Sequence, residues 1–235
     1  MNLVLLLPED LVAPARARLT GRRLAHVREV HRATVGDELV VGLLNGKMGR
    51  GRVLRLDDKA LELELTLDQT PPPKLPLTLL IAVPRPKVLN RVVAAAASLG
   101  AARIVLLNAW KVEKAYWASP RMKPGNLREQ LILGLEQAKD TVLPDLRLAR
   151  LFRPFVEDEL PGLLAGGTGL MAHPGTGAGA PKVLAAPVTL AIGPEGGWVE
   201  AEVQSLLKAG LHPLDLGPRI LRTETALAAL VGKLF

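Results

Sequence analysis

The C-terminal part of the chain contains two glycine-bearing motifs, Ile192-Gly193-Pro194-Glu195-Gly196-Gly197-Trp198 and Leu216-Gly217-Pro218-Arg219-Ile220-Leu221-Arg222-Thr223-Glu224-Thr225-Ala226. Each motif predicts an apolar strand that runs into a tight bend and then into a helix. Glycines in the first bend permit positive φ and let a ligand approach bare backbone. Strand ends of this kind are where α/β sheets build their binding sites. The two motifs therefore predict an α/β domain in which both bends line one ligand pocket.

Alternating apolar strands and amphipathic helices extend from these motifs back to about residue 77. This alternation is typical of a mostly parallel α/β sheet. Asn126, with Glu129 three residues later, predicts the start of a helix that reaches about Thr141. The other expected strands are Leu77–Val83, Arg103–Asn108, Arg147–Phe152, Gly169–Ala172, Val188–Ile192 and Leu211–Leu216, and the other expected helices include Lys87–Leu99, Phe155–Leu164 and Thr223–Phe235.

Residues 1–70 have a different pattern, which is mostly β. Asn45-Gly46 between two apolar runs is a strong hairpin signal. From Leu61 to Leu67, leucines alternate with polar residues at a period of two, and a short helix is expected between Arg22 and Val30. The proline-rich stretch Thr70–Pro76 can continue neither strand nor helix. We therefore expect a small β-barrel over residues 1–70 and the α/β domain over residues 71–235.

The charge of the chain points to a polyanionic partner. The formal net charge is +7, and residues 71–153 alone carry 14 Lys and Arg against 5 Asp and Glu. A second basic cluster in the first domain predicts a phosphate-contact surface, with a solvated helix face as the alternative. Only seven residues are aromatic, so base-stacking platforms are scarce and a single-strand reader of the RRM or OB type is disfavoured. The cluster comprises Arg16, Arg18, Arg22, Arg23, Arg28 and Arg32.

Several other classes of site are disfavoured by what the sequence lacks. The absence of cysteine excludes disulfides, thiolate zinc sites and thiol nucleophiles, and the four histidines show no metal-ligand spacing. There is no P-loop motif and no G-x-S-x-G. We interpret Gly175–Gly179 as a surface loop because Pro181 comes soon after it and no acidic residue closes a following strand to hold a ribose. The apolar run Leu3–Leu7 is too short for a cleavable signal, and no apolar run is long enough for a membrane span. A cytoplasmic protein is expected.

Together, the two motifs resemble the C-terminal motifs of SPOUT-class RNA methyltransferases, and most closely the bacterial 16S rRNA uracil-N3 methyltransferases of the RsmE type. Leu135–Ala138 with Pro144 is similar to that family's mid-domain helix, although Lys139 and Thr141 depart from its usual pattern. Val35-Gly36-Asp37 and the Asn45-Gly46 hairpin are similar to its PUA-like barrel. The resemblance implies a PUA-like barrel followed by a SPOUT domain with a deep trefoil knot.

The resemblance also implies S-adenosylmethionine as cofactor, 16S ribosomal RNA of the small subunit as substrate, no metal and a homodimer. Arg222 would stabilise negative charge on the uracil, and Glu195 or Glu224 would accept the N3 proton or orient Arg222. Two alternatives stay open at this level, a ribose 2′-O-methyltransferase of the same class and a non-catalytic RNA-binding protein. The residues implied to hold the cofactor are Leu170, His173, Ile192, Gly193, Glu195, Gly196, Gly197, Leu216, Gly217, Ile220, Leu221 and Thr225.

Overall fold

A computed structural model describes residues 2–179, 181 and 186–235 and divides the chain into two compact units. The N-terminal unit comprises residues 1–73 together with 132–143, and the C-terminal unit comprises residues 74–131 and 144–235. The expected domain boundary near residue 70 lies close to the boundary between the two units at residues 73 and 74. The end of one helix, α4 (Pro124–Ala138), is also part of the N-terminal unit, although the sequence pattern places it within the α/β domain.

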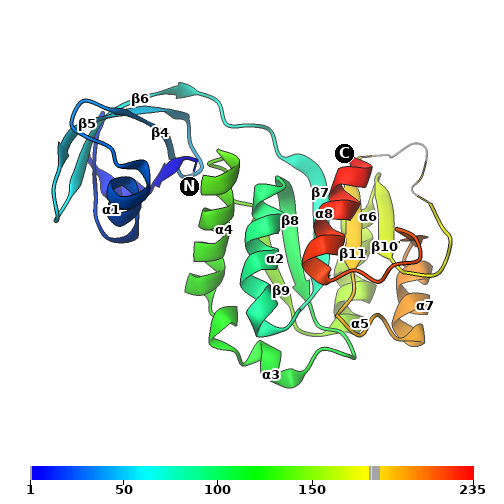
Figure 1. The fold of residues 1–235 in the computed structure, drawn as a ribbon. Coiled ribbons are helices and arrows are strands. Elements are labelled where there is room, and N and C mark those ends of the chain that lie inside the picture. The colour runs from blue at the N-terminus through cyan, green and yellow to red at the C-terminus, as the bar shows by residue number, and fades with distance from the viewer. Residues whose placement is uncertain (1, 180, 182–185) are drawn as a thin grey trace. The chain divides into compact units, whose positions relative to one another are not determined.

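The N-terminal unit is built on a curled six-stranded sheet (Figure 1). The strand order is β1-β4-β5-β6-β3-β2, in which β1 runs parallel to β4 and the other pairs are antiparallel. Asn45 adopts a positive φ of 57° in the β4–β5 turn, as the hairpin signal predicts. The strands are β1 (Val4–Leu6), β2 (Leu11–Ala13), β3 (Arg16–Leu19), β4 (Glu38–Leu43), β5 (Met48–Leu56) and β6 (Leu61–Gln69).

Alternation along β6 builds the core of this unit. Leu61, Leu63 and Leu65 are buried, whereas Glu64 between them is exposed. The expected helix near residue 22 is α1 (Gly21–His26), which continues through one π-helical turn, η2 (Val27–His31). The apolar core thus lies between the concave face of the sheet and this helix, with Leu24 and Val27 contributed by the helical segment.

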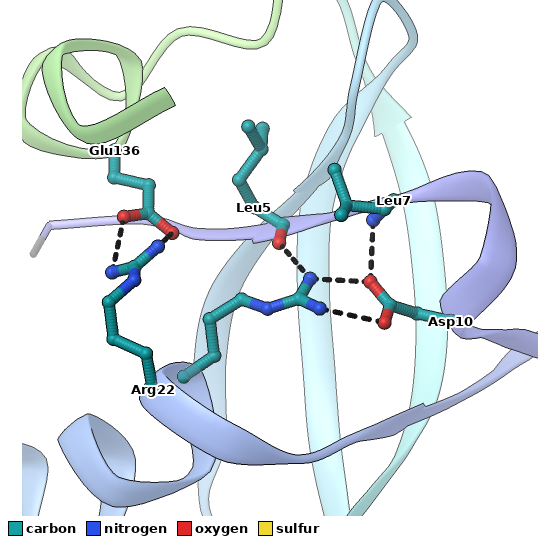
Figure 2. Close-up of polar contacts among 6 residues, drawn as sticks. Leu5, Leu7, Asp10, Arg22 and Glu136 are labelled. Atoms are coloured by element: carbon teal, nitrogen blue, oxygen red, sulfur yellow. Dashed lines mark hydrogen bonds and ion pairs between the residues drawn. The ribbon is translucent and has the colours of Figure 1, made fainter. Parts of the chain in front are cut away.

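The end of α4 is hydrogen-bonded to the two residues that precede β1. The backbone N–H groups of Asn2 and Leu3 both donate to the Glu136 carbonyl, at 3.0 and 3.1 Å. The Glu136 side chain is 1% exposed and accepts two hydrogen bonds from the Arg22 guanidinium, at 2.9 and 3.2 Å (Figure 2). Burial nevertheless raises the pKa of Glu136 above its usual value, because desolvation outweighs the nearby arginines.

The C-terminal unit contains a second six-stranded sheet in which every pairing is parallel. The strand order is β12-β10-β11-β7-β8-β9, so β10 lies between β11 and β12. Helices α2 (Pro86–Ser98) and α8 (Thr223–Leu234) lie side by side on one face of this sheet (Figure 1). The strands are β7 (Leu75–Ala82), β8 (Ala101–Leu107), β9 (Asp145–Ala149), β10 (Thr168–Ala172), β11 (Val188–Ile192) and β12 (Leu211–Leu214).

The remaining helical segments of the unit connect these strands. Helix α4 begins at Pro124, so the prediction of Asn126 as its N-cap was wrong; the Asn126 side chain instead donates to the Arg121 carbonyl at 2.7 Å. The expected helix over 155–164 begins earlier and is interrupted by a π-helical turn. No helix in the described ranges is long and apolar enough to cross a membrane. The segments are α3 (Lys114–Trp117), η3 (Pro120–Met122), α5 (Phe152–Pro154), η4 (Phe155–Glu159), α6 (Leu160–Leu164) and α7 (Glu200–Lys208).

Candidate cofactor and substrate site

The two glycine-bearing bends meet at the carboxyl edge of the parallel sheet, where they enclose a cavity of about 230 Å³. We call this cavity the two-bend cavity. Because β10, β11 and β12 are neighbouring parallel strands, the segments that leave them reach the same edge. A smaller hollow of about 60 Å³ adjoins it and shares His173 and Leu221. The two-bend cavity is lined by Ala172, His173, Pro174, residues 192–198, Ile220, Leu221, Arg222, Thr223 and Ala226.

The first bend is shaped by two of its glycines. Gly197 has a φ of +71° and donates from its N–H to the Pro194 carbonyl at 2.8 Å, a conformation that residues with a Cβ rarely adopt. A Cβ on Gly193 would lie 3.1 Å from the indole of Trp198. Trp198 can therefore pack flat against the bend and is 6% exposed.

Trp198 gives a direct test of whether a cofactor fits this cavity. Its indole N–H is buried and has no hydrogen-bond acceptor among the described residues. An orphaned buried donor is costly, and it is satisfied when a ligand with acceptor oxygens or nitrogens is bound. Apolar walls with such a donor and exposed glycine backbone suit a small polar ligand with an adenine or carboxylate group.

Asp215 anchors the loop beside the smaller hollow. Its carboxylate accepts hydrogen bonds from the backbone N–H groups of Gly177 at 3.0 Å and Gly217 at 2.8 Å. These N–H groups hold the pKa of Asp215 below its usual range. The Asp215 N–H also donates to the Ala178 carbonyl at 2.7 Å. The segment interpreted as a surface loop is therefore tied to the strand end that leads into the second bend.

A second cavity, of about 740 Å³, lies next to the first and shares Glu195, Arg222 and Thr223 with it. We call it the arginine cavity. Both α2 and α8 begin at this cavity, with Arg85 and Arg222 as their N-caps. Helix N-termini carry partial positive charge, so two of them add to the field of the arginines. It is lined by Arg85, Pro86, Lys87, Val88, Arg91, Tyr116, Glu195, Arg222, Thr223 and Glu224.

Most charged groups of the arginine cavity have a partner. Glu195 accepts a hydrogen bond from the Arg85 backbone N–H at 2.9 Å, and Glu224 pairs with Arg91 at 3.1 Å. Neither carboxylate is recorded in contact with Arg222, whose side chain has no ion pair or hydrogen bond among the described residues. Burial and a hydrogen bond to Glu113 raise the pKa of Tyr116, which keeps its hydroxyl protonated. Among the described residues, Arg222 and Lys87 are thus the cations of this cavity whose side chains have no ion pair or hydrogen bond.

The structure brings most of the predicted site residues together and leaves two apart. Leu170 is fully buried inside the sheet, and Thr225 is exposed on α8 and lines none of these cavities. Within the described ranges, no three His, Asp or Glu side chains gather to hold a metal ion. The predicted residues that line the two-bend cavity or the adjoining hollow are His173, Ile192, Gly193, Glu195, Gly196, Gly197, Leu216, Gly217, Ile220, Leu221 and Arg222.

The sequence reasoning missed several residues of the arginine cavity. Arg85 and Lys87 lie within five residues of the end of β7, a central strand of the parallel sheet, at the start of α2. Their position after a strand end is the signal that could have found them, since α/β sites form there. Asp215, at the end of β12, carries the same signal. Arg91 reaches the site from the second turn of α2, and a residue within a helix gives no such signal.

The basic cluster of the N-terminal unit separates into exposed and paired side chains. Arg23 donates to both carboxylate oxygens of Asp10 and to the Leu5 carbonyl at 2.8 Å, and its side chain is largely buried (Figure 2). Arg22 is held by Glu136, as described above, and Arg28 pairs with Asp58 at 2.8 Å. The predicted phosphate contacts of Arg22 and Arg23 therefore conflict with the structural bonds that these residues make. Within the part of the chain that the structure describes, Arg16, Arg18 and Arg32 form no ion pair, and all three are exposed.

The parallel sheet with two adjoining cavities at its carboxyl edge is the arrangement in which α/β proteins build nucleotide sites, and the second cavity is lined by cations that suit anionic groups. The chain belongs to the RNA methyltransferase domain family, whose model matches residues 71–234.

Similar proteins cover almost the entire chain. The ribosomal RNA small subunit methyltransferase E of Treponema pallidum is 30% identical over 97% of this chain and 88% of its own length. The protein of the same name from Synechocystis is 28% identical over 93% of this chain and 72% of its own length. The crystal structure of the Neisseria gonorrhoeae enzyme of this name, bound to S-adenosyl methionine, has a TM-score of 0.78 at 22% identity, covering 99% of this chain and 95% of that one. These matches confirm the expected family and α/β fold class.

Proposed function

We propose that this protein is an S-adenosylmethionine-dependent methyltransferase that methylates N3 of a uridine in 16S ribosomal RNA of the small subunit. Membership of the RNA methyltransferase domain family supports the reaction class. The names of the most similar relatives support small-subunit ribosomal RNA as the substrate. The observation that carries the proposal is that Arg222 and Glu195 line both adjoining cavities, so a charge-stabilising group and a carboxylate lie where the two ligands would meet.

The two-bend cavity is the proposed cofactor site. S-adenosylmethionine supplies an electrophilic methyl group on its sulfonium sulfur. Glycine backbone at residues 193, 196 and 197 would contact the adenine without side-chain collisions, and Leu221 and Ile220 would cover the cavity. The Trp198 indole N–H would donate to an acceptor of the cofactor. Asp215 would hold the loop of residues 175–178 against the adjoining hollow.

The arginine cavity is the proposed substrate site. It contains four cationic side chains against two carboxylates; Glu224 pairs with the Arg91 guanidinium, and Glu195 accepts from the Arg85 backbone N–H. An RNA strand brings phosphates, and a uracil brings O2 and O4, to which negative charge spreads when N3 loses its proton. Arginines and helix N-termini favour both kinds of oxygen. The volume of about 740 Å³ admits a nucleotide.

Methyl transfer then requires three things of these residues. The uracil must lie in line with the methyl group, which the walls shared by the two cavities would provide. The N3 proton must leave, and Glu195 is the carboxylate that lines both cavities; Glu224 is paired with Arg91 and would orient the cations. Charge on the uracil oxygens must be stabilised, which is the role we assign to Arg222 because it is permanently charged and its side chain has no partner among the described residues.

Further features of the proposal concern the N-terminal unit and the assembly. We propose that the curled sheet is a PUA-like barrel and that Arg16, Arg18 and Arg32 contact RNA phosphates. We also propose that the C-terminal segment forms a deep trefoil knot, which the insertion of β10 between β11 and β12 supports. A homodimer and a cytoplasmic location follow from the family resemblance and from ribosomal RNA as the substrate. A crystal structure traced through residues 168–235 and light scattering test the knot and the dimer.

The proposed activity is tested by methyl transfer from labelled S-adenosylmethionine. Purified protein should transfer label to small-subunit ribosomal RNA, either free or in assembled subunits, and not to large-subunit RNA. Calorimetry should show binding of one S-adenosylmethionine per chain. Absence of cofactor binding would favour a non-catalytic RNA-binding protein and overturn the proposal.

A further inference from the structure

A third cavity, of about 770 Å³, lies within the C-terminal unit and has no role in the function proposed above. We call it the tryptophan cavity. It lies beyond the carboxyl end of β8, between α3, α5 and the start of α7. The residues that line it are Asn108, Ala109, Trp110, Val112, Lys114, Trp117, Phe152, Arg153, Val156, Glu157, Val199, Ala201, Glu202 and Ser205.

Aromatic side chains are concentrated at this cavity in a chain that has only seven of them. Trp110, Trp117 and Phe152 all line it. Trp110 is 82% exposed, although its backbone is fixed by a hydrogen bond from its N–H to Glu202 at 2.7 Å. A large indole face held open to solvent has no part in the core, and it is available to stack on a planar ligand.

The charges that remain around the cavity are positive. Both carboxylate oxygens of Glu202 are used, by the N–H groups of Trp110 and Val199, and Glu157 is paired with Arg153 at 2.8 Å. Lys114 and Arg150 have no ion pair among the described residues. The Arg150 guanidinium lies 5.1 Å from the centroid of the Trp117 ring, a cation–π contact. A ligand with a planar ring and a nearby negative charge fits this combination.

The tryptophan cavity borders the same bend as the proposed cofactor site. Phe152, which lines the tryptophan cavity, contacts Trp198 of the two-bend cavity, with ring centroids 6.2 Å apart. Lys111, next to Trp110, donates from its Nζ to the Gly196 carbonyl at 2.6 Å. A nucleotide in the tryptophan cavity would therefore lie near the reacting groups, within reach of a neighbour on the same strand.

We infer that the tryptophan cavity binds an unpaired nucleobase of the substrate RNA, close in sequence to the methylated uridine. This inference rests on the proposed function for its choice of RNA. Aromatic faces stack on any base, and sequence-specific RNA proteins commonly take up splayed bases in this way. Trp110 supplies the stacking face, and Lys114 and Arg150 attract the adjoining phosphates. Binding of one flanking base would fix the strand so that the target reaches the arginine cavity.

The test is a scan with abasic RNA. Fluorescence anisotropy measures the affinity for a labelled small-subunit RNA fragment and for a series of fragments that each lack one base. For the wild type, removal of one particular base should weaken binding roughly 5- to 100-fold, the range of one stacked base. Trp110→Ala should weaken binding of the intact fragment by a similar factor and show no further loss with that abasic fragment. Trp110→Phe should retain most of the affinity.

Phe235→Ala is the matched control, because Phe235 is an exposed aromatic residue that lines none of these cavities. Circular dichroism should show unchanged folding for both alanine variants. If Trp110→Ala bound the abasic fragment with a loss of affinity equal to the product of the two separate losses, the two changes would act independently and the inference would be overturned. So would a change in oligomeric state on Trp110→Ala without weaker RNA binding, which would assign the cavity to contact between copies of the chain. Because the scan measures binding, failure of methyl transfer would reject the proposed function without deciding this inference.

Discussion

Replacement of Arg222 by alanine should slow catalysis by orders of magnitude and leave the fold intact. Arg222 is the N-cap of α8 and acts there through its backbone, since its carbonyl accepts from the Ala226 N–H at 2.8 Å. Its side chain is exposed and forms no ion pair among the described residues. A cation at a helix N-terminus is unfavourable by a few tenths of a kcal/mol or more. The variant should therefore unfold at the same temperature as the wild type or slightly higher.

The effect on the reaction should be much larger. Loss of one donor that stabilises developing charge costs on the order of 10²- to 10³-fold in rate, or about 3–4 kcal/mol of barrier. Single-turnover methyl transfer at saturating labelled cofactor measures this rate, and calorimetry should show nearly unchanged affinity for S-adenosylmethionine. Arg222→Lys keeps the charge but loses the planar fork, so its rate should be intermediate.

Arg128→Ala is the matched control, because Arg128 is also exposed, lies in the same unit and lines none of the cavities. It should methylate at the wild-type rate. Wild-type turnover by Arg222→Ala would remove Arg222 from the mechanism. Loss of cofactor binding with the rate preserved at high cofactor concentration would instead assign Arg222 to the cofactor site.

Three further outcomes follow from the structure. Arg22→Ala should destabilise the N-terminal unit by about 3 kcal/mol, because it leaves the buried Glu136 carboxylate without its partner. This value is at the low end of such effects because the Arg22 side chain is 42% exposed. Denaturant unfolding measures the change, and an unchanged free energy of unfolding would mean that solvent replaces the pair. Arg16→Ala combined with Arg18→Ala should reduce the slope of log affinity for RNA against log salt by roughly 1.5 to 2, and an unchanged slope would exclude both from phosphate contact. Asp215→Ala should release the loop of residues 175–178 and weaken cofactor binding several-fold. Because backbone N–H groups hold the pKa of Asp215 below its usual value, its contribution should be present above the usual pKa and be lost only as the pH falls through the lowered one. Cofactor affinity that does not change in Asp215→Ala would place the loop outside the site.

Local patterns in the sequence were sufficient to predict much of this fold. The period of two in β6, the Asn45-Gly46 turn and the apolar strands before each glycine bend are all encoded by near neighbours. These patterns also placed the two bends at one pocket, since consecutive parallel strands end at the same edge of a sheet. The strand order could not be obtained in this way. Nothing local to Thr168–Ala172 specifies that β10 lies between β11 and β12, because that depends on pairing across the whole unit.

The role of the basic cluster was also beyond local reasoning. Arg22 and Arg23 look like free surface cations in the sequence because their carboxylate partners are distant. Glu136 lies 114 residues from Arg22, and Asp10 lies 13 residues from Arg23, with both β2 and β3 between them. Composition alone likewise indicated few stacking platforms. The fold gathers three of the seven aromatic residues at one cavity, which a count of residues does not reveal.

The central claim is that the two adjoining cavities transfer a methyl group to N3 of a uridine. Nucleoside mass spectrometry of small-subunit RNA treated with the protein and S-adenosylmethionine tests it most directly. The account predicts 3-methyluridine at a single position, formed on the order of 10²- to 10³-fold more slowly when Arg222→Ala replaces the wild type. Formation of 2′-O-methyluridine, or of a methylated base other than uracil, would contradict it.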